Sequence, residues 1–365
     1  MRQMRRICTD GNDRNYGVDL LRVVSMFYIV MIHNLGYGGV VAAAARGSAH
    51  HLVGRFLEMW VYSALDIFAL ISGYVGYREQ EQKFHYSNYL ILWLQVVVTG
   101  LATAGIFWIF APGTVAPVEF LRALTPITSN THWYFTAYTG LFFLMPLLNA
   151  GVRGSSREQL YKLVAVLVIL FSVYSTLGDR WQLKSGFSCL WLITLYFIGA
   201  VAKKYRWESL ISPKLAVAGI VVSACLSWGV RLLEDYRPFM DRSLVDNTYL
   251  TPTHLCGALC YLLLFAGMRI PDWMKKGIAL AAPGTFAVYL LNCNRLIWNR
   301  FVVSQFAGLA AEPLPVMLLG VVGGAVVFVL LAVLADMLRQ QLFRLLRIKK
   351  RVRCLADRLA LGKEK

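Results

Sequence analysis

The chain has 365 residues, of which 58% are hydrophobic and 16% are charged. A soluble protein is nearer half apolar and a quarter charged, so the composition excludes an ordinary soluble domain and indicates a polytopic membrane protein. In such a protein the formal net charge of +17 is more typical of cytoplasmic loops beside anionic lipid than of nucleic-acid binding. We therefore expect membrane lipids, and no nucleic acid, as partners.

Ten apolar runs are long enough to cross a bilayer, which takes about 20 residues with latitude for tilt. Placing the N-terminus inside puts most lysines and arginines in the inner loops, as the positive-inside rule favours. The sequence thus predicts an all-α bundle of about ten transmembrane helices with both termini cytoplasmic. The runs fall at about 17–40, 52–77, 87–111, 131–149, 158–177, 188–203, 213–232, 254–271, 279–302 and 313–338.

Three other segments complete the predicted organisation. No cleavable signal peptide is expected, because the first residues are polar and basic and the first apolar run is too long. Residues 115–130 contain two prolines and a short apolar face, which indicates an outer re-entrant or interfacial helix. We divide the chain into a transmembrane domain at 1–338 and a basic amphipathic cytoplasmic tail at 339–365, which we expect to lie on the inner leaflet.

The first span, YGVDLLRVVSMFYIVMIHNLGYGGV, carries Asp19, Arg22 and His33. A charged side chain at membrane depth costs roughly 2.5–3.5 kcal/mol, so such residues are rarely bystanders. At about 100° per residue, Arg22 and His33 point within roughly 20° of each other, and Asp19 lies within about 60° of both. His33 lies about 16 Å further along the axis than Arg22. The three ionisable residues on one face of this span therefore predict a functional site inside the membrane.

The second span holds Arg55, Glu58 and Asp66. Arg55 and Glu58 are three residues apart, which favours a structural ion pair on one helix face. Asp66 has no nearby partner in its own helix. We therefore expect it to meet a cation on another helix or to line a wet cavity.

Two later spans carry weaker signals. The fourth opens with His132-Trp133-Tyr134-Phe135, an aromatic cluster typical of the interfacial belt. The ninth contains Pro283-Gly284-Thr285, followed by Tyr289 and Asn292. A Pro-Gly pair followed by polar side chains indicates a helix that is irregular where it lines a cavity.

The seven cysteines are scattered and lie mostly inside apolar runs, without zinc-ligand spacing to histidines. We interpret them as small buried hydrophobic residues, with no metal site and no redox role.

Four blocks together resemble the acyltransferase-3 family of bacterial membrane O-acyltransferases: YGVDLLRVVSMFYIVMIHN, LDIFALISGYVGY, HWYFTAYTGLFFLMPLLN and APGTFAVYLLN. The resemblance covers most of the chain, and the spacing of Arg22 and His33 is its most specific part. It implies a multi-pass protein of the bacterial plasma membrane that moves an acyl group, commonly acetyl, from cytoplasmic acyl-CoA to a hydroxyl of an envelope or extracellular glycan or of another hydroxylated acceptor, such as a small molecule. It implies no permanently bound cofactor.

Residue by residue, the family's essential histidine falls on His33, its first-span arginine on Arg22, and a tryptophan that starts the fourth span on Trp133. Many members have a His-His pair where this chain has His33-Asn34. This difference indicates that only the first histidine is required.

The family's Arg-x-x-Arg motif at the inner start of the third span is missing from KFHYSNYLILWLQ. The nearest cations include Arg78 and Lys83, which we take with Arg22 and Asp19 as the candidate donor-binding residues. Asp19 would orient Arg22.

In the resulting hypothesis, neutral His33 acts as general base on the acceptor hydroxyl, because an imidazole titrates close to working pH. A mechanism in which His33 itself carries the acyl group as a covalent intermediate is an open alternative. Candidate cavity-lining residues are Asp66, Trp133, Tyr289 and Asn292. The alternatives are a transporter or flippase of a glycan or lipid carrier, since intramembrane ionisable groups also mark transport pathways, and a structural scaffold.

Overall fold

The computed structural model describes residues 14–81, 84–236 and 248–361, and every regular element in these ranges is helical. The all-α prediction is confirmed. The first four helices are α1 (Tyr16–Leu35), α2 (Val40–Ala43), α3 (Ala49–Val61) and α4 (Ala64–Gly76). The others are α5 (Ser87–Phe110), α6 (Val118–Leu124), α7 (Trp133–Gly154), α8 (Arg157–Val168), η1 (Ile169–Val173), η2 (Tyr174–Leu177), η3 (Lys184–Gly186), α9 (Cys189–Lys204), η4 (Trp207–Ser209), α10 (Pro213–Tyr236), α11 (Pro252–Ala266), α12 (Asp272–Ala281), η5 (Ala282–Gly284), α13 (Thr285–Asn292), α14 (Arg295–Phe301), η6 (Ala307–Ala311), α15 (Leu314–Leu345) and α16 (Ile348–Leu361).

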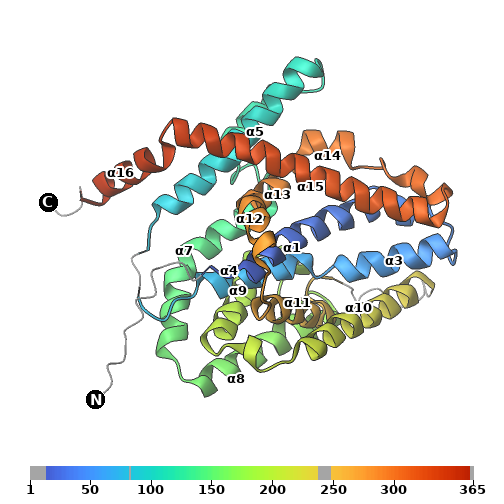
Figure 1. Ribbon diagram of the computed structural model, residues 1–365, viewed down its shortest axis with the longest axis horizontal. Coiled ribbons are helices and arrows are strands. Elements are labelled where there is room, and N and C mark those ends of the chain that lie inside the picture. The colour runs from blue at the N-terminus through green and yellow to red at the C-terminus, as the bar shows by residue number, and fades with distance from the viewer. Residues whose placement is uncertain (1–13, 82–83, 237–247, 362–365) are drawn as a thin grey trace.

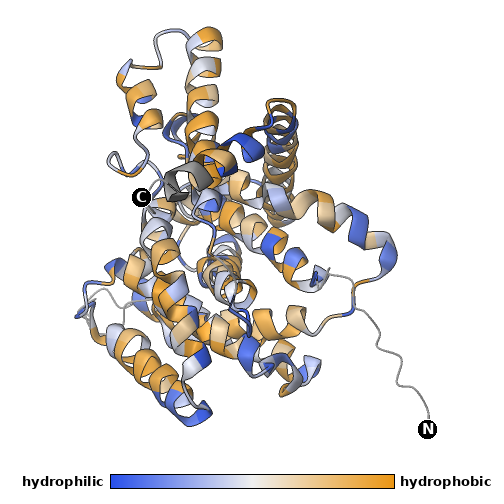
Figure 2. Ribbon diagram, turned by 90° about the vertical axis from the view of Figure 1, so that its left-hand side faces the viewer, coloured by the Kyte–Doolittle hydropathy of each residue, from blue (hydrophilic) through white to orange (hydrophobic). Residues whose placement is uncertain are grey.

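Within the described residues, seven helical stretches are long and apolar enough to cross a membrane. The three other predicted spans correspond to shorter helices: 188–203 to α9, 254–271 to α11, and 279–302 to the end of α12 with η5, α13 and α14. The count of ten and the cytoplasmic termini therefore stay predictions. Figure 2 shows hydrophobic residues along the outward faces of the long helices, with hydrophilic residues gathered at helix ends and loops.

The α1 helix lies inside the bundle, where α15 runs along it and α3, α4 and α11 pack against it (Figure 1). The apolar stretch from Tyr16 to Ala43 is 61% buried and that of α3 and α4 is 67% buried, against 28% for α5, α10 and α15. A charged residue on α1 is therefore held among protein side chains, while the outer helices present apolar surface as a lipid-facing helix does.

Close packing of α4 against α9 depends on glycine. A Cβ at Gly73 would lie 1.9 Å from the Tyr196 carbonyl oxygen, and one at Gly199 would lie 2.2 Å from that of Leu70. Small residues let helix backbones approach in this way within a membrane. This contact fixes the position of α4, whose residues Leu65 and Phe68 line a pocket beside His33.

The predicted ninth span is interrupted, as the Pro-Gly pair indicates. A short 3-10 turn, η5, contains Pro283 and separates α12 from α13, and the chain breaks again after Asn292. The Asn294 side chain then accepts a hydrogen bond from the backbone N–H of Leu296 and starts α14. The end of α13 lies against α1, where Asn292 is hydrogen-bonded to His33.

The segment at 115–130 forms one short helix, α6, which packs against α5. The α15 helix continues without interruption from Leu314 to Leu345, so the predicted domain boundary at 338 lies inside a helix. The proposed division of the chain is not tested by this continuity and stays a prediction.

Candidate functional site

His33 is held by Asn292, which lies at the end of α13. The Nδ1 atom of His33 is hydrogen-bonded to the Asn292 amide oxygen, and Asn292 is only 1% exposed. An amide oxygen can only accept, so with the Asn292 amide in this orientation the proton is assigned to Nδ1 and the lone pair to Nε2. The imidazole also packs edge-on against the Trp298 ring, with 4.8 Å between ring centroids.

A large cavity adjoins His33 at the C-terminal end of α1. We call it the aromatic cavity; it has a volume of about 860 Å³. Trp133 and Tyr289, both expected to line a cavity, line this one. Its other lining residues are Ile32, His33, Gly36, Tyr37, Val41, Ala42, Arg55, Glu58, Tyr62, Asn130, Thr131, His132, Phe187, Arg231, Tyr249, Cys293, Arg295 and Trp298.

The arginines of the aromatic cavity are all ion-paired. Arg55 donates to Glu58 at 2.7 Å, which confirms the expected pair, and also to Asp235 of α10 at 2.7 Å and 3.0 Å. Arg231 donates to Glu234 at 2.9 Å. Arg295 lies 3.2 Å from Glu119, which also pairs with Arg122. The cavity therefore offers hydrogen-bonding groups whose charges are already balanced.

A small cavity lies on the other side of His33, toward the N-terminal end of α1. We call it the apolar pocket; it has a volume of about 50 Å³. Five residues line this pocket alone: Met26, Ile29, Leu65, Phe68 and Tyr134. Six residues line both it and the aromatic cavity: His33, Trp133, Phe187, Tyr249, Tyr289 and Cys293. His33 thus lies at the junction of the two cavities.

Tyr289 contributes a hydroxyl at the same junction. Its oxygen accepts a hydrogen bond of 3.0 Å from the backbone N–H of Tyr134, in the first turn of α7. A phenol that accepts in this way keeps its own O–H as a donor.

Arg22 lies further toward the start of α1, one turn before Met26. The buried carboxylate of Asp19 pairs with Arg22 at 3.1 Å and with Arg14 at 2.6 Å. Asp19 is therefore in contact with Arg22 as expected, and it joins that arginine to a second one.

Arg14 in turn borders a third cavity, of about 520 Å³, at the N-terminal end of α1. We call it the basic cavity. Its lining contains four cations, Arg14, Lys203, Arg269 and Lys275, and no acidic residue. Among the described residues neither Lys203 nor Arg269 forms an ion pair.

The fourth cation of the basic cavity is held in its charged form. The hydrogen bond and charge of Asp272 raise the pKa of the Lys275 ammonium. Lys275 is therefore ion-paired, as is Arg14 through Asp19, and Lys203 and Arg269 are the cations of this cavity without an ion pair among the described residues.

Two of the predicted residues lie elsewhere, and a third is not described. Arg78 is exposed and does not line the basic cavity, and Lys83 lies outside the described residues. Asp66 is fully buried and accepts a hydrogen bond of 3.0 Å from the Trp191 indole. Among described residues no cation pairs with it and none of the three cavities is lined by it, so the expectation of a cation or a wet cavity is wrong for Asp66.

Sequence reasoning misplaced or missed several groups. Asn292 was expected to line a cavity, but it lies behind His33 and borders neither adjoining cavity. Lys203, Arg269 and Lys275 are not among the candidate donor-binding residues that the sequence indicates. The described residues contain no group of three or more His, Cys, Asp or Glu side chains that could hold a metal ion.

A buried ionisable helix face inside a bundle of apolar helices defines a multi-pass membrane protein with an internal site. A family model described as an acyltransferase domain, acyltransferase 3, matches residues 15–337. The chain therefore belongs to the acyltransferase-3 family, as the sequence blocks indicate. Comparison with curated proteins and with solved structures gives no match.

Proposed function

We propose that the protein transfers an acyl group from cytoplasmic acyl-CoA to a hydroxyl of an envelope or extracellular glycan, in the plasma membrane of a bacterium. The observation that carries the proposal is the face of α1 on which Arg22, Met26, Ile29 and His33 follow one another at helical spacing. This face leads from a cation beside the basic cavity to a base at the junction of two cavities. Family membership supplies the reaction class.

The basic cavity suits the donor. Coenzyme A carries several phosphates, and cations without an acidic partner attract phosphate strongly. Positive-inside reasoning places this end of α1 in the cytoplasm, where acyl-CoA is made. Lys203 and Arg269, which form no ion pair among the described residues, would take the place of the absent Arg-x-x-Arg motif, while Asp19 fixes the Arg22 guanidinium at the entry to the apolar face.

His33 suits the base. With Nδ1 hydrogen-bonded to Asn292, Nε2 is free to take the proton of an acceptor hydroxyl as its oxygen attacks the thioester carbonyl carbon. The C–S bond then breaks, the coenzyme A sulfur leaves, and the imidazolium returns its proton to that sulfur. The Tyr289 O–H is available to stabilise the carbonyl oxygen as it becomes negative.

The aromatic cavity suits a glycan. Its balanced ion pairs and aromatic rings offer hydrogen bonds and stacking without a net field. A further cavity of about 290 Å³ shares Asn130, Thr131, His132 and Arg295 with it. The two together have room for an acceptor that extends beyond one sugar unit.

The test is transfer of label from radiolabelled acetyl-CoA to envelope glycans in membranes that carry the wild type, His33→Ala or His50→Ala. His50 is a matched control because it lines none of the cavities described above. Label that depends on His33 and not on His50 supports the proposal, and equal labelling by His33→Ala places the base elsewhere.

A transporter or flippase is the second candidate, favoured by the cavities at the two ends of a helix that carries buried charges. Purified protein in detergent distinguishes the two. Turnover of acyl-CoA there supports an acyltransferase, and its absence with several acyl-CoA donors supports transport.

A further inference from the structure

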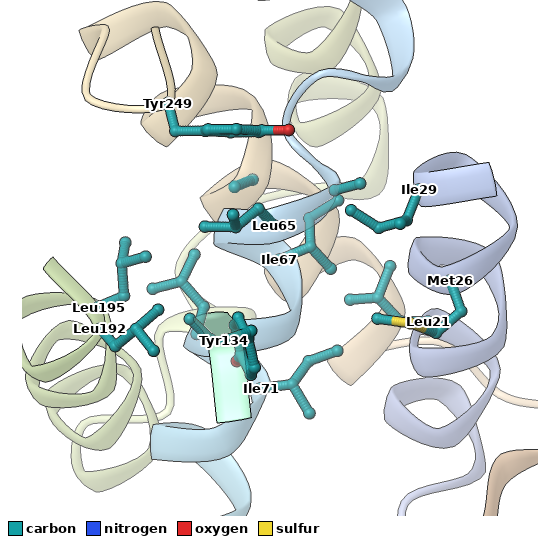
Figure 3. Close-up of a cluster of buried hydrophobic side chains, with 14 of the residues drawn as sticks. Leu21, Met26, Ile29, Leu65, Ile67, Ile71, Tyr134, Leu192, Leu195 and Tyr249 are labelled. Atoms are coloured by element: carbon teal, nitrogen blue, oxygen red, sulfur yellow. The ribbon is translucent and has the colours of Figure 1, made fainter. Parts of the chain in front are cut away.

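The apolar pocket is the only one of the three cavities along α1 whose walls carry no charged side chain in the described residues. In Figure 3, Ile29 points from α1 toward Leu65 of α4, with Tyr249 on one side of the space and Tyr134 on the other. Met26, Ile29 and Leu65 are each less than 8% exposed. The walls carry no charge that would bind a phosphate, and Met26, Ile29, Leu65 and Phe68, which line this pocket alone, offer a surface for a hydrocarbon.

The position of the pocket on α1 matters as much as its chemistry. Met26 and Ile29 stand between Arg22 and His33 on one helix face, at offsets of four and seven residues from Arg22. The pocket therefore adjoins His33 on the side of α1 that faces its N-terminal end.

The size of the pocket is restrictive. A cavity needs roughly 10–15 Å³ of this kind of volume to hold one water molecule, so about 50 Å³ holds only a few atoms. That is the size of an acetyl or propionyl group, whereas hexanoyl and octanoyl chains are larger. The neighbours Leu21 and Ile67 are fully buried, and a closely packed core expands only at a cost.

We infer that the apolar pocket is the acyl-binding site and that Met26, Ile29 and Leu65 limit the transferred group to acetyl or propionyl. The inference rests on the proposed function and adds the substrate class of the donor. The pocket walls limit the length of the acyl chain, because each additional methylene has to displace a buried side chain.

The test uses purified full-length protein with membrane glycans as acceptor, and measures release of free coenzyme A thiol from acetyl-, propionyl-, hexanoyl- and octanoyl-CoA. Since one methylene in a hydrophobic pocket changes the rate about 10-fold or more, we expect the wild type to use hexanoyl-CoA at least about 100-fold more slowly than acetyl-CoA. Ile29→Ala and, independently, Met26→Ala should raise the ratio of hexanoyl to acetyl turnover at least about 10-fold.

Ile198→Ala is the matched control. Ile198 lies in α9, is 2% exposed and lines none of the cavities described above, so it removes the same atoms from the core while leaving the ratio unchanged. Thermal unfolding of each variant establishes that the protein is folded.

Two outcomes overturn the inference while leaving the proposed function in place. One is equal use of acetyl- and hexanoyl-CoA by the wild type, and the other is an unchanged ratio in folded Ile29→Ala and Met26→Ala. A third outcome contradicts the proposed function itself: the wild type releases no thiol from any acyl-CoA. In that case the assignment of the acyl-binding site is wrong as well.

Discussion

The two ends of α1 differ in how their cations are compensated. In the basic cavity Lys203 and Arg269 form no ion pair among the described residues, while Arg14 pairs with Asp19 and Lys275 with Asp272. In the aromatic cavity each arginine pairs with a carboxylate: Arg55 with Glu58, Arg231 with Glu234, and Arg295 with Glu119. Cations without such partners suit a polyanion, and balanced pairs suit a neutral ligand rich in hydroxyls.

Under the proposed function, this difference would separate the two substrates along one helix. The phosphate-bearing donor would bind at the end with unpaired cations, and the uncharged acceptor at the end with balanced ion pairs. The reacting groups would meet at the junction between them, where His33 lies. Substitutions at the two ends and at the junction should therefore affect different kinetic constants.

The largest effect is expected at the junction. Replacing His33 by alanine removes the base and should lower kcat by about 10²–10⁴-fold, while binding of coenzyme A to the basic cavity stays unchanged. Single-turnover transfer and equilibrium binding of coenzyme A measure the two separately. A matching loss of coenzyme A affinity would mean that His33 holds the donor.

A smaller loss is expected when only the orientation of His33 changes. In Asn292→Ala the imidazole keeps its position on α1 but loses the acceptor that fixes its tautomer, and we expect kcat to fall about 10–10²-fold, as for other partners that orient a histidine. Asn292→Asp keeps an accepting oxygen and should restore part of the rate. If both variants keep wild-type kcat, the contact between Asn292 and His33 has no role in catalysis.

The sequence predicts interactions between residues that are close together in the chain, and it does not predict those between distant segments. Helical periodicity is local, so the common face of Arg22 and His33 and the pairing of Arg55 with Glu58 could be predicted. The break at Pro283-Gly284 could be predicted for the same reason, because a proline acts on its own helix.

The interactions that escaped prediction join distant segments. Asn292 is 259 residues from His33 in the chain, and Trp191 is 125 residues from Asp66. The Trp191 indole N–H donates to one oxygen of the Asp66 carboxyl, and no periodicity in the sequence indicates that partner. The basic cavity is formed by the ends of several helices, so its cations look in the sequence like separate loop charges.

The donor end supplies a prediction of intermediate size. Lys203→Gln combined with Arg269→Gln removes two unpaired cations, each worth up to about 1 kcal/mol to a bound phosphate at a solvated site, so KM for acyl-CoA should rise about 10-fold with kcat unchanged. Initial rates over a range of acyl-CoA concentration measure this change. Lys214→Gln with Lys276→Gln is the control, because it removes two exposed lysines that do not line the cavity.

The salt dependence of KM for acyl-CoA, measured in the wild type and in the Lys203→Gln, Arg269→Gln double variant, tests the same difference between the two ends of α1. Exposed charges are screened over about 10 Å at 0.1 M salt, so KM of the wild type for acyl-CoA should rise with salt while KM of the double variant changes little. Equal salt dependence in both would place the donor phosphates outside the basic cavity.

The smallest effect is expected at the acceptor end. Tyr37 is 62% exposed and packs against Trp298, with 4.9 Å between ring centroids, in front of His33. Tyr37→Ala removes one aromatic face, worth about 0.5–1.5 kcal/mol, so KM for the glycan should rise about 2- to 10-fold while KM for acyl-CoA stays constant. Because the arginines there are already paired, this KM should not depend on salt. A salt-dependent acceptor KM would instead indicate an anionic glycan, since only a charged acceptor would have to compete with Glu58, Glu234 and Glu119 for their arginines.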